Sequence, residues 1–436
     1  MTKDFLLLIR LFSFSAKGEP VSDELLGEFF DGDKGIDAEK LRRVYAAAMI
    51  QNCSAMTDIA VQDILVKSGY EEEASRYLKR IKLQIMSSSA VSGQIHELVT
   101  QLEKKGIEAK ILKGMSLSYL YAIPECRTSC DTDILIPKSK ENSAYEVMRE
   151  LGYKIAPRTE YSHHATCTHP KAGAVELHTD LFFERITDVI FDKEDFNKKL
   201  SESCGSFLIN GLAFKTLGVT ENLIYITLHM IQHFIRSGTS VRQLYDLLIY
   251  CKTYKAEVDQ KEYFSYLERF SYTGIYNAVM SCGVEYFGFE EDELMRFERL
   301  SKDVVDEFLT DIENGGWIGK RRDDGYAFFR AYGNLKAKNS NTLDEKQYKK
   351  ELKKYQRNRM ISSVFPDKER LIAKFPYAEN PLLRPFAWFS WLGYGFSLLR
   401  QGELSSDVKD EGELSESDKK RFSLFEKLDM IDSEDR

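Results

Sequence analysis

The sequence contains few of the residues that cross-link or rigidify a chain. It has 7 cysteines, 9 prolines and 3 tryptophans in 436 residues. The cysteines are odd in number and widely scattered, and none forms a Cys-x-x-Cys pair. This pattern argues against a disulfide framework or a zinc knuckle, and it favours reduced thiols in a cytoplasmic protein.

The sequence also lacks an excess of basic charge. The net charge is -8, and residues 401–436 contribute -6 of it through 12 acidic and 6 basic residues, which leaves about -2 for the rest of the chain. A protein that neutralises nucleic-acid phosphates needs a concentrated basic face. The composition therefore argues against nucleic acid and favours a small-molecule or protein partner.

Long apolar runs are absent as well. The N-terminal segment 1–14 is interrupted by Arg10 and precedes no small-residue cleavage site, so we expect a helix there rather than a targeting segment. The aromatic stretch 375–399 contains charged residues and three prolines. It does not fit a membrane span.

Hydrophobic residues make up 43% of the chain and charged residues 30%, as in globular proteins. The patterns predict an α+β fold with four regions. These are N-terminal helices (1–104), a small α/β core with a mixed sheet (105–218), a C-terminal helical domain (219–400) and an acidic tail expected to be mobile (401–436). The oligomeric state does not follow from the sequence.

Apolar periodicity and turn residues predict the individual elements. Helices are expected over 38–65, 71–105 and 138–151, the last ending at Gly152, and a short one near 419–430. Strands are expected over 108–112, 133–136, 153–156, 164–168 and 174–181, with a hairpin turn at 171–173.

The most informative stretch is 108–136. It predicts a strand ending at Lys113, a short helix opening near Met115, a loop with Arg127, and a second strand that begins with Asp131 and Asp133. Residues two apart on a strand point to the same side, so the two carboxylates aim at one position. Such oxygen ligands favour Mg²⁺ or Mn²⁺ bridging to phosphate. The bare pattern is weak, since Asp31-Gly-Asp33 repeats it by chance.

Groups that bind phosphate are expected just before these acids. Backbone amides at a helix start bind anions, which makes Gly114 to Ser116 a candidate phosphate cradle. Lys113 or Arg127 could neutralise the remaining phosphate charge. A third acid is expected on a later strand, where Glu176 is the first choice and Asp180 the alternative. His178, between them, is expected to orient a carboxylate or to contact the substrate.

These motifs together resemble the nucleotidyltransferase superfamily of the polymerase-β type. The matching residues are Leu112-Lys113-Gly114, Leu117, Tyr121, Pro124, Arg127, Asp131-x-Asp133-Ile-Leu-Ile and Glu176-Leu-His178. The chain is most similar to little-characterised bacterial nucleotidyltransferase family proteins, related to antibiotic and toxin nucleotidyltransferases. In that superfamily adjacent glycine and serine residues hold the phosphates, whereas Met115 separates them here.

The resemblance implies a function and a set of roles. The expected reaction moves a nucleoside monophosphate from an NTP to a hydroxyl or phosphate of a small-molecule or protein acceptor and releases pyrophosphate. Asp131 and Asp133 would bind the metals, and Glu176 would complete the site.

A helical segment downstream supports this expectation. His229 and His233 are four residues apart, as are Arg242 and Asp246, so each pair lies on one helix face. The family carries similar patterns, which implies a wall of the nucleotide pocket, with Arg242 near phosphate or holding Asp246. A buried hydrogen-bonded histidine pair is the alternative, whereas a zinc hydrolase lacks its third ligand. The histidines at 163, 164, 169 and 178 look too irregular for a metal cage.

Two other functions compete with this one. A sugar-nucleotide glycosyltransferase also uses Asp-x-Asp with a metal, but it needs a longer α/β half ahead of that motif. A catalytically silent nucleotide-binding or protein-interaction module would keep the fold without turnover. The presence of all three acids argues against it.

Overall fold

The computed structural model describes most of the chain, and the remaining segments include Asp31 and Asp33. The described residues are 1–30, 35–156, 164–181, 193–236, 238–315, 371–372, 375–400 and 416–430. The chain divides into two compact units, Met1–Arg322 with Leu424–Met430, and Asp323–Ser423 with Ile431–Arg436. The predicted boundaries at 105, 219 and 401 fall inside these units and stay predictions.

A five-stranded mixed sheet forms the centre of the first unit, and this confirms the predicted α+β class. Its strand order is β1-β2-β5-β4-β3, and β2 and β5 run parallel while all other neighbours are antiparallel. The strands are β1 (Lys110–Ile111), β2 (Asp131–Leu135), β3 (Lys154–Ile155), β4 (His164–His169) and β5 (Gly173–His178). All five were predicted, with boundaries shifted by at most three residues, and the turn at 171–173 joins β4 to β5 as expected.

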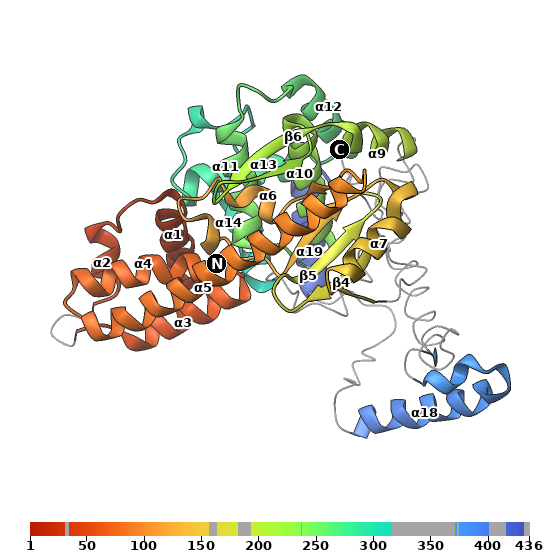
Figure 1. The fold of residues 1–436 in the computed structure, drawn as a ribbon. Helices are drawn as coiled ribbons and strands as arrows, with labels where there is room; N and C mark the ends of the chain where they lie inside the picture. The colour runs from red at the N-terminus through yellow and green to blue at the C-terminus, as the bar shows by residue number, and fades with distance from the viewer. Residues whose placement is uncertain are drawn as a thin grey trace. The chain divides into compact units, whose positions relative to one another are not determined.

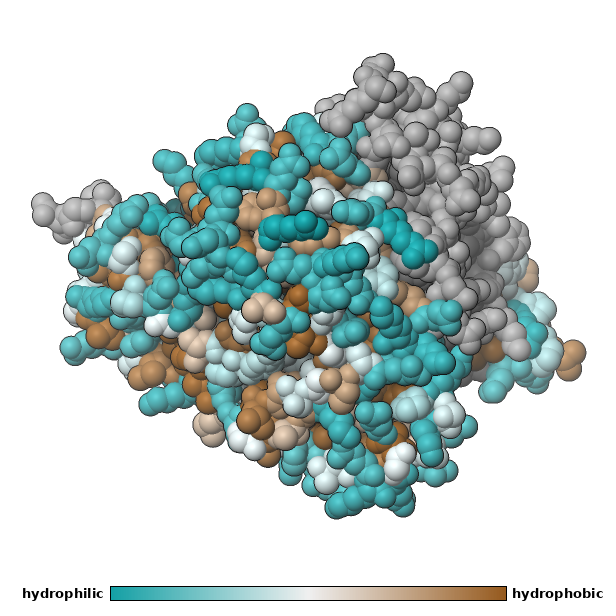
Figure 2. Space-filling view, turned by 90° about the horizontal axis from the view of Figure 1, so that it is seen from above, coloured by the Kyte–Doolittle hydropathy of each residue, from teal (hydrophilic) through white to brown (hydrophobic). Residues whose placement is uncertain are grey.

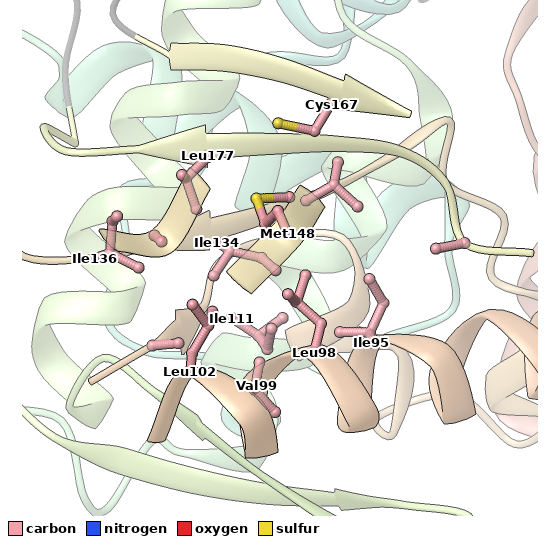
Figure 3. Packing of buried hydrophobic residues seen from close by; sticks show 14 of the residues in the cluster. Ile95, Leu98, Val99, Leu102, Ile111, Ile134, Ile136, Met148, Cys167 and Leu177 are labelled. Atoms are coloured by element: carbon pink, nitrogen blue, oxygen red, sulfur yellow. The ribbon is translucent and has the colours of Figure 1, made fainter. Parts of the chain in front are cut away.

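One face of the sheet packs against a long helix. Helix α5 (Glu71–Lys104) places Leu98 and Leu102 against Ile111 of β1 and Ile134 of β2, and α7 (Glu141–Glu150) closes the core with Met148 (Figure 3). Each fully buried side chain of this size stabilises the fold by about 1.5–3 kcal/mol. The core fixes the position of β2, the strand that carries Asp131 and Asp133.

The N-terminal part of the chain is helical, as predicted. Its helices are α1 (Lys3–Lys17), α2 (Asp23–Glu28), α3 (Ala38–Ile50), α4 (Ser54–Lys67) and α5. Helix α5 extends from this group to the sheet and links the two (Figure 1). Helix α1 is capped at its start by Thr2, whose side chain accepts a hydrogen bond from the Phe5 amide, and at its end by Gly18 in the left-handed conformation.

The single helix predicted over 38–65 is wrong, because the chain breaks between Ile50 and Ser54. Asn52 adopts a positive φ of 50°, which a continuing helix does not allow. Its carbonyl and side chain both accept hydrogen bonds from Thr128 Oγ1. The break therefore joins the N-terminal helices to the loop that precedes Asp131.

A second β-hairpin was not predicted. Strands β6 (Gly205–Ile209) and β7 (Leu212–Thr216) pair antiparallel across Asn210 and Gly211, both with positive φ. Asn-Gly is a strong two-residue hairpin signal because both positions tolerate this conformation. Helix α9 (Lys193–Glu202) leads into the hairpin.

Helices return after residue 218, as expected for the C-terminal helical domain. They are α10 (Val219–Arg236), α11 (Val241–Thr253), α12 (Gln260–Phe270), α13 (Thr273–Tyr286) and α14 (Lys302–Gly315). A further helix, α19 (Glu416–Lys427), confirms the short one predicted near 419–430. Phe425, at its end, is fully buried and stacks on Phe234 of α10.

Three further helical elements lie in the second unit, which also includes the first residues of α19. They are η5 (Pro376–Glu379), η6 (Pro381–Leu383) and α18 (Arg384–Arg400), with a small core around Ala378 and Ala387. In the part of the chain that the structure describes, no helix has both the length and the apolarity needed to cross a bilayer. On the face drawn in Figure 2, hydrophilic residues predominate and hydrophobic ones lie interspersed among them.

Candidate active site

Three carboxylates meet on the neighbouring parallel strands β2 and β5. Asp131 and Asp133 lie two residues apart on β2, and the strand register places Glu176 directly beside Asp133. Asp133 is buried, whereas the Glu176 side chain keeps 22% of its surface exposed. The parallel pairing thus gathers acids that lie more than 40 residues apart in sequence.

A lysine, Lys113, lies beside this cluster just after β1. Its Nζ lies 3.1 Å from Asp133 Oδ1 and donates a hydrogen bond to His229 Nε2 at 3.2 Å. Burial alone raises the pKa of Asp133, but the Lys113 ammonium and the hydrogen bond from His178 outweigh it and hold that pKa well below its usual range. Asp133 therefore stays ionised.

Asp131 is in a different electrostatic position. Burial and the charge of Asp133 raise the pKa of Asp131 above its usual value, and its one described hydrogen bond comes from Ser129 Oγ at 3.5 Å. A cation placed between the two carboxylates would offset both the cost of burying their charges and the repulsion between them. The donor set therefore fits a divalent metal.

A pocket that opens to solvent lies in front of Asp131 and Asp133. Its volume, including the space at the opening, is about 750 Å³. Its opposite wall is formed by α10 and α11. Nine of the twelve predicted site residues line it, namely Lys113, Gly114, Arg127, Asp131, Asp133, His229, His233, Arg242 and Asp246. The other three, Ser116, Glu176 and His178, do not line it.

Helix α11 holds a guanidinium against this pocket. A capping box between Ser240 and Gln243 fixes the start of the helix, and Arg242 follows the cap directly. Arg242 is 8% exposed, one of its nitrogens donates to the Thr128 carbonyl, and its Nε has no hydrogen-bond partner among the residues that the structure describes. Burial and the charge of Arg127 lower its pKa. Within the described residues Arg242 forms no ion pair, so its charge is available to an anionic ligand.

Asp246 is held by a different arginine. Arg127 donates two hydrogen bonds to its carboxylate, at 2.8 and 2.5 Å, and Tyr121 donates a third at 2.7 Å. The sequence left two roles open for Arg242, namely binding phosphate and holding Asp246. Because Arg127 holds Asp246, the geometry favours phosphate binding by Arg242. Arg127 was expected to neutralise phosphate, but its charge is already balanced here.

The predicted phosphate cradle is smaller than expected. Helix α6 (Met115–Ser118) has only four residues, and Ser116 is fully buried behind Gly114. Gly114 has a φ of 40°, and a Cβ there would lie 3.0 Å from Ser129 Oγ. Glycine at this position therefore lets the backbone approach the loop before Asp131.

The two candidates for the third acid lie in different surroundings. Glu176 is adjacent to Asp133, and His178 Nε2 lies 2.9 Å from Asp133 Oδ1 and 3.5 Å from Glu176 Oε2. Asp180 lies beyond the end of β5 and accepts a hydrogen bond from Asn197. This geometry favours Glu176 and makes His178 a link between two acids.

One residue near the acids, His164, was not among the site residues expected from the sequence. His164 Nε2 lies 3.3 Å from Glu176 Oε1, and the ligand atoms of His164, Glu176 and His178 all lie within 4.8 Å of one another. The histidines of this region thus include a group with metal-binding geometry. The hairpin turn at 171–173 could have revealed it, because its register places His164 opposite His178.

Comparison with known proteins defines the class. A family model described as an uncharacterised nucleotidyltransferase matches residues 38–288, more than half of the chain and including every predicted site residue. The protein is therefore a nucleotidyltransferase. It belongs to this uncharacterised nucleotidyltransferase family.

Solved structures give weaker similarities. The solution structure of the antibiotic-resistance factor ANT(2'')-Ia matches with a TM-score of 0.32 and 12% identity, over 42% of this chain and 95% of that one. An antigenic nucleotidyltransferase-like protein from Paracoccidioides brasiliensis matches with a TM-score of 0.28 and 15% identity, over 41% and 87%. No match was found among curated protein sequences.

Proposed function

We propose that the protein transfers a nucleoside monophosphate from an NTP to a hydroxyl or phosphate of a small-molecule or protein acceptor, with release of pyrophosphate and with Mg²⁺ or Mn²⁺ as cofactor. The observation that carries this proposal is the register of β2 and β5. It sets Glu176 beside Asp133, with Asp131 on the same side of β2, next to a pocket that also contains Arg242, which forms no ion pair among the described residues.

Asp131, Asp133 and Glu176 would hold the metal. When bound, a divalent ion stabilises the attacking and leaving oxygens of an in-line displacement. The raised pKa of Asp131 supports this assignment, because the half-buried Asp131 beside the buried Asp133 needs a positive charge nearby. Glu176, whose side chain keeps 22% of its surface exposed, is also the proposed acceptor of the proton from the attacking hydroxyl.

Arg242 and Lys113 would bind the triphosphate. They lie on α11 and after β1, so they reach the pocket from two different elements. Charge-assisted hydrogen bonds to phosphate are stronger than neutral ones, especially where water is excluded. His229 and His233, whose ring centroids are 4.5 Å apart, would form the wall beside them.

The acceptor class rests on charge and on the open pocket. An overall charge of -8 disfavours a polyanionic acceptor such as nucleic acid.

All seven cysteines are free, which supports a reducing, cytoplasmic location.

The test is pyrophosphate release from each of the four NTPs with Mg²⁺, using Asp131→Asn and Glu176→Gln beside the parent protein. Both variants should lose at least about 100-fold in kcat, the size typical of a lost acid–base or electrostatic group. Asp180→Asn, whose carboxyl contacts Asn197, should retain activity. Unchanged turnover in Asp131→Asn at a matched melting temperature would refute the proposal.

The competing functions make different predictions in the same experiment. Membership of a nucleotidyltransferase family does not support the sugar-nucleotide glycosyltransferase. A catalytically silent module would bind NTP without forming any nucleotidylated product in a mass-spectrometric acceptor screen.

A further inference from the structure

A group of metal-ligand side chains lies beside the proposed magnesium site, on three adjacent strands. Glu176 and His178 are two residues apart on β5 and point to the same side. His164 is the register partner of His178 on β4, and Asp133 is that of Glu176 on β2. The sheet thus brings two imidazoles and two carboxylates together.

The distances suit a single ion. His164 Nε2 lies 3.3 Å from Glu176 Oε1, and His178 Nε2 lies 3.5 Å from Glu176 Oε2. Ligand atoms bound about 2.0–2.1 Å from a tetrahedral zinc are separated by about 3.3 Å. Asp133 Oδ1, 2.9 Å from His178 Nε2, adds an oxygen at the same end of the group.

The ligand types select the metal. Imidazole nitrogen suits Zn²⁺, Co²⁺ and Ni²⁺, whereas Mg²⁺ takes oxygen ligands. The His164 and Glu176 side chains keep 21% and 22% of their surface exposed, so an ion can reach them from solvent. The site therefore differs in chemistry from the all-carboxylate site that Asp131 and Asp133 begin.

We propose that His164, Glu176 and His178 form a binding site for a zinc-class transition-metal ion, with Asp133 as a neighbouring fourth oxygen. Binding replaces the proton on His178 Nε2 with the metal, so one proton is released to solvent. The consequence for catalysis rests on the proposed function. Because Glu176 belongs to both sites, zinc withdraws it from the magnesium site and inhibits nucleotidyl transfer.

Metal binding itself is tested without nucleotide. The chelator-treated, tag-free full chain is titrated with Zn²⁺ against a chromophoric chelator, and with Co²⁺ by visible absorption. We expect one tight site per chain, and His164→Ala should weaken its affinity at least about tenfold, the minimum loss for a group that supports a metal site. His169→Ala is the matched control, because it alters the same strand at the opposite end, beside Tyr153.

Two other groups could bind zinc, and the experiment separates them. His229→Ala tests the histidine pair on α10 and should leave the affinity unchanged. A near-ultraviolet thiolate-to-cobalt band would instead indicate the exposed Cys130 or Cys204. Equal affinity in the parent and His164→Ala, or a loss confined to His229→Ala, would overturn the proposal. If His164→Ala unfolds, anomalous diffraction at the zinc edge on the parent protein locates the ion directly.

The inhibitory step has its own readout. Zn²⁺ should inhibit pyrophosphate release in the parent protein and do so at least about tenfold more weakly in His164→Ala. Tight zinc binding in a protein that releases no pyrophosphate under any condition would uphold the metal site and refute the nucleotidyltransferase proposal alone. Inhibition of equal strength in both proteins would refute the regulatory consequence alone.

Discussion

Arg127 and Asp246 form a buried two-point ion pair, with nitrogen to oxygen distances of 2.8 and 2.5 Å. Both side chains are at most 7% exposed, and Tyr121 donates a third hydrogen bond to the same carboxylate. The pair joins the loop before β2 to helix α11. It therefore sets the distance between the carboxylates and the pocket wall that carries Arg242.

We predict that Arg127→Met lowers the free energy of unfolding by about 3–5 kcal/mol, because it leaves the Asp246 charge buried without its partner. Urea denaturation measures the change. Arg42→Gln is the control, since Arg42 pairs with Glu39 at 76% and 63% side-chain exposure and should contribute about 0–1 kcal/mol. Equal changes in the two variants would contradict a structural role for the buried pair.

Arg242→Met should weaken NTP binding by about 10- to 100-fold, because charge-assisted hydrogen bonds of about 1.5–3 kcal/mol are lost. Its stability should change little, since Arg242 has no carboxylate partner to leave unpaired among the described residues. Calorimetry with a non-hydrolysable NTP gives the affinity, and the nucleoside without phosphates is the control ligand. A proportional loss of nucleoside binding would show that Arg242 does not act through phosphate.

Lys113→Met removes the ammonium that faces Asp133. In EDTA we expect a melting temperature several degrees lower than that of the parent, because a buried carboxylate loses a charge partner. Added Mg²⁺ should raise the melting temperature more in the variant than in the parent, because the ion replaces the missing cation. An identical magnesium response in the two proteins would show that Lys113 and the metal do not share Asp133.

Gly211→Ala tests the unpredicted hairpin. Gly211 has a φ of 76° and open space around it, so the substitution should cost about 1–2 kcal/mol through backbone conformation alone. Gly93→Ala is the matched control, because Gly93 also has open space but lies inside helix α5, where alanine should stabilise by about 0.5–1 kcal/mol. In thermal unfolding we expect Gly211→Ala to lower the melting temperature and Gly93→Ala to raise it. Destabilisation by both substitutions would contradict the prediction.

Phe425→Ala should destabilise the first unit by about 3–5 kcal/mol, because the ring is fully buried and its centroid lies 5.4 Å from that of Phe234. Lys427→Ala, which removes a surface ion pair with Glu307, is the control and should cost about 0–1 kcal/mol. Comparable losses in chemical denaturation would mean that the helix near the C-terminus is not part of the core.

Local patterns in the sequence were sufficient to predict much of the fold. The alternation of apolar residues identified β2 and β5, and Gly152 marked the end of α7. Two signals were present but not used, namely Asn52 as a helix break and Asn210-Gly211 as a hairpin turn. Both depend on the left-handed backbone conformation, which short apolar runs do not reveal.

The sequence by itself determined the residue types of the site: the two aspartates at the head of a strand, a later Glu-x-His, and the His-x-x-x-His and Arg-x-x-x-Asp helix. These follow from local spacing, because period 2 or 3.6 fixes which side chains share a face. Only the tertiary structure decided which partners meet. Whether Asp246 pairs with Arg127 or Arg242, and whether His164 reaches Glu176, depends on strand register and helix packing between segments far apart in the chain. Short-range patterns do not encode those distances, since burial and competing charges select each pair once the chain has folded.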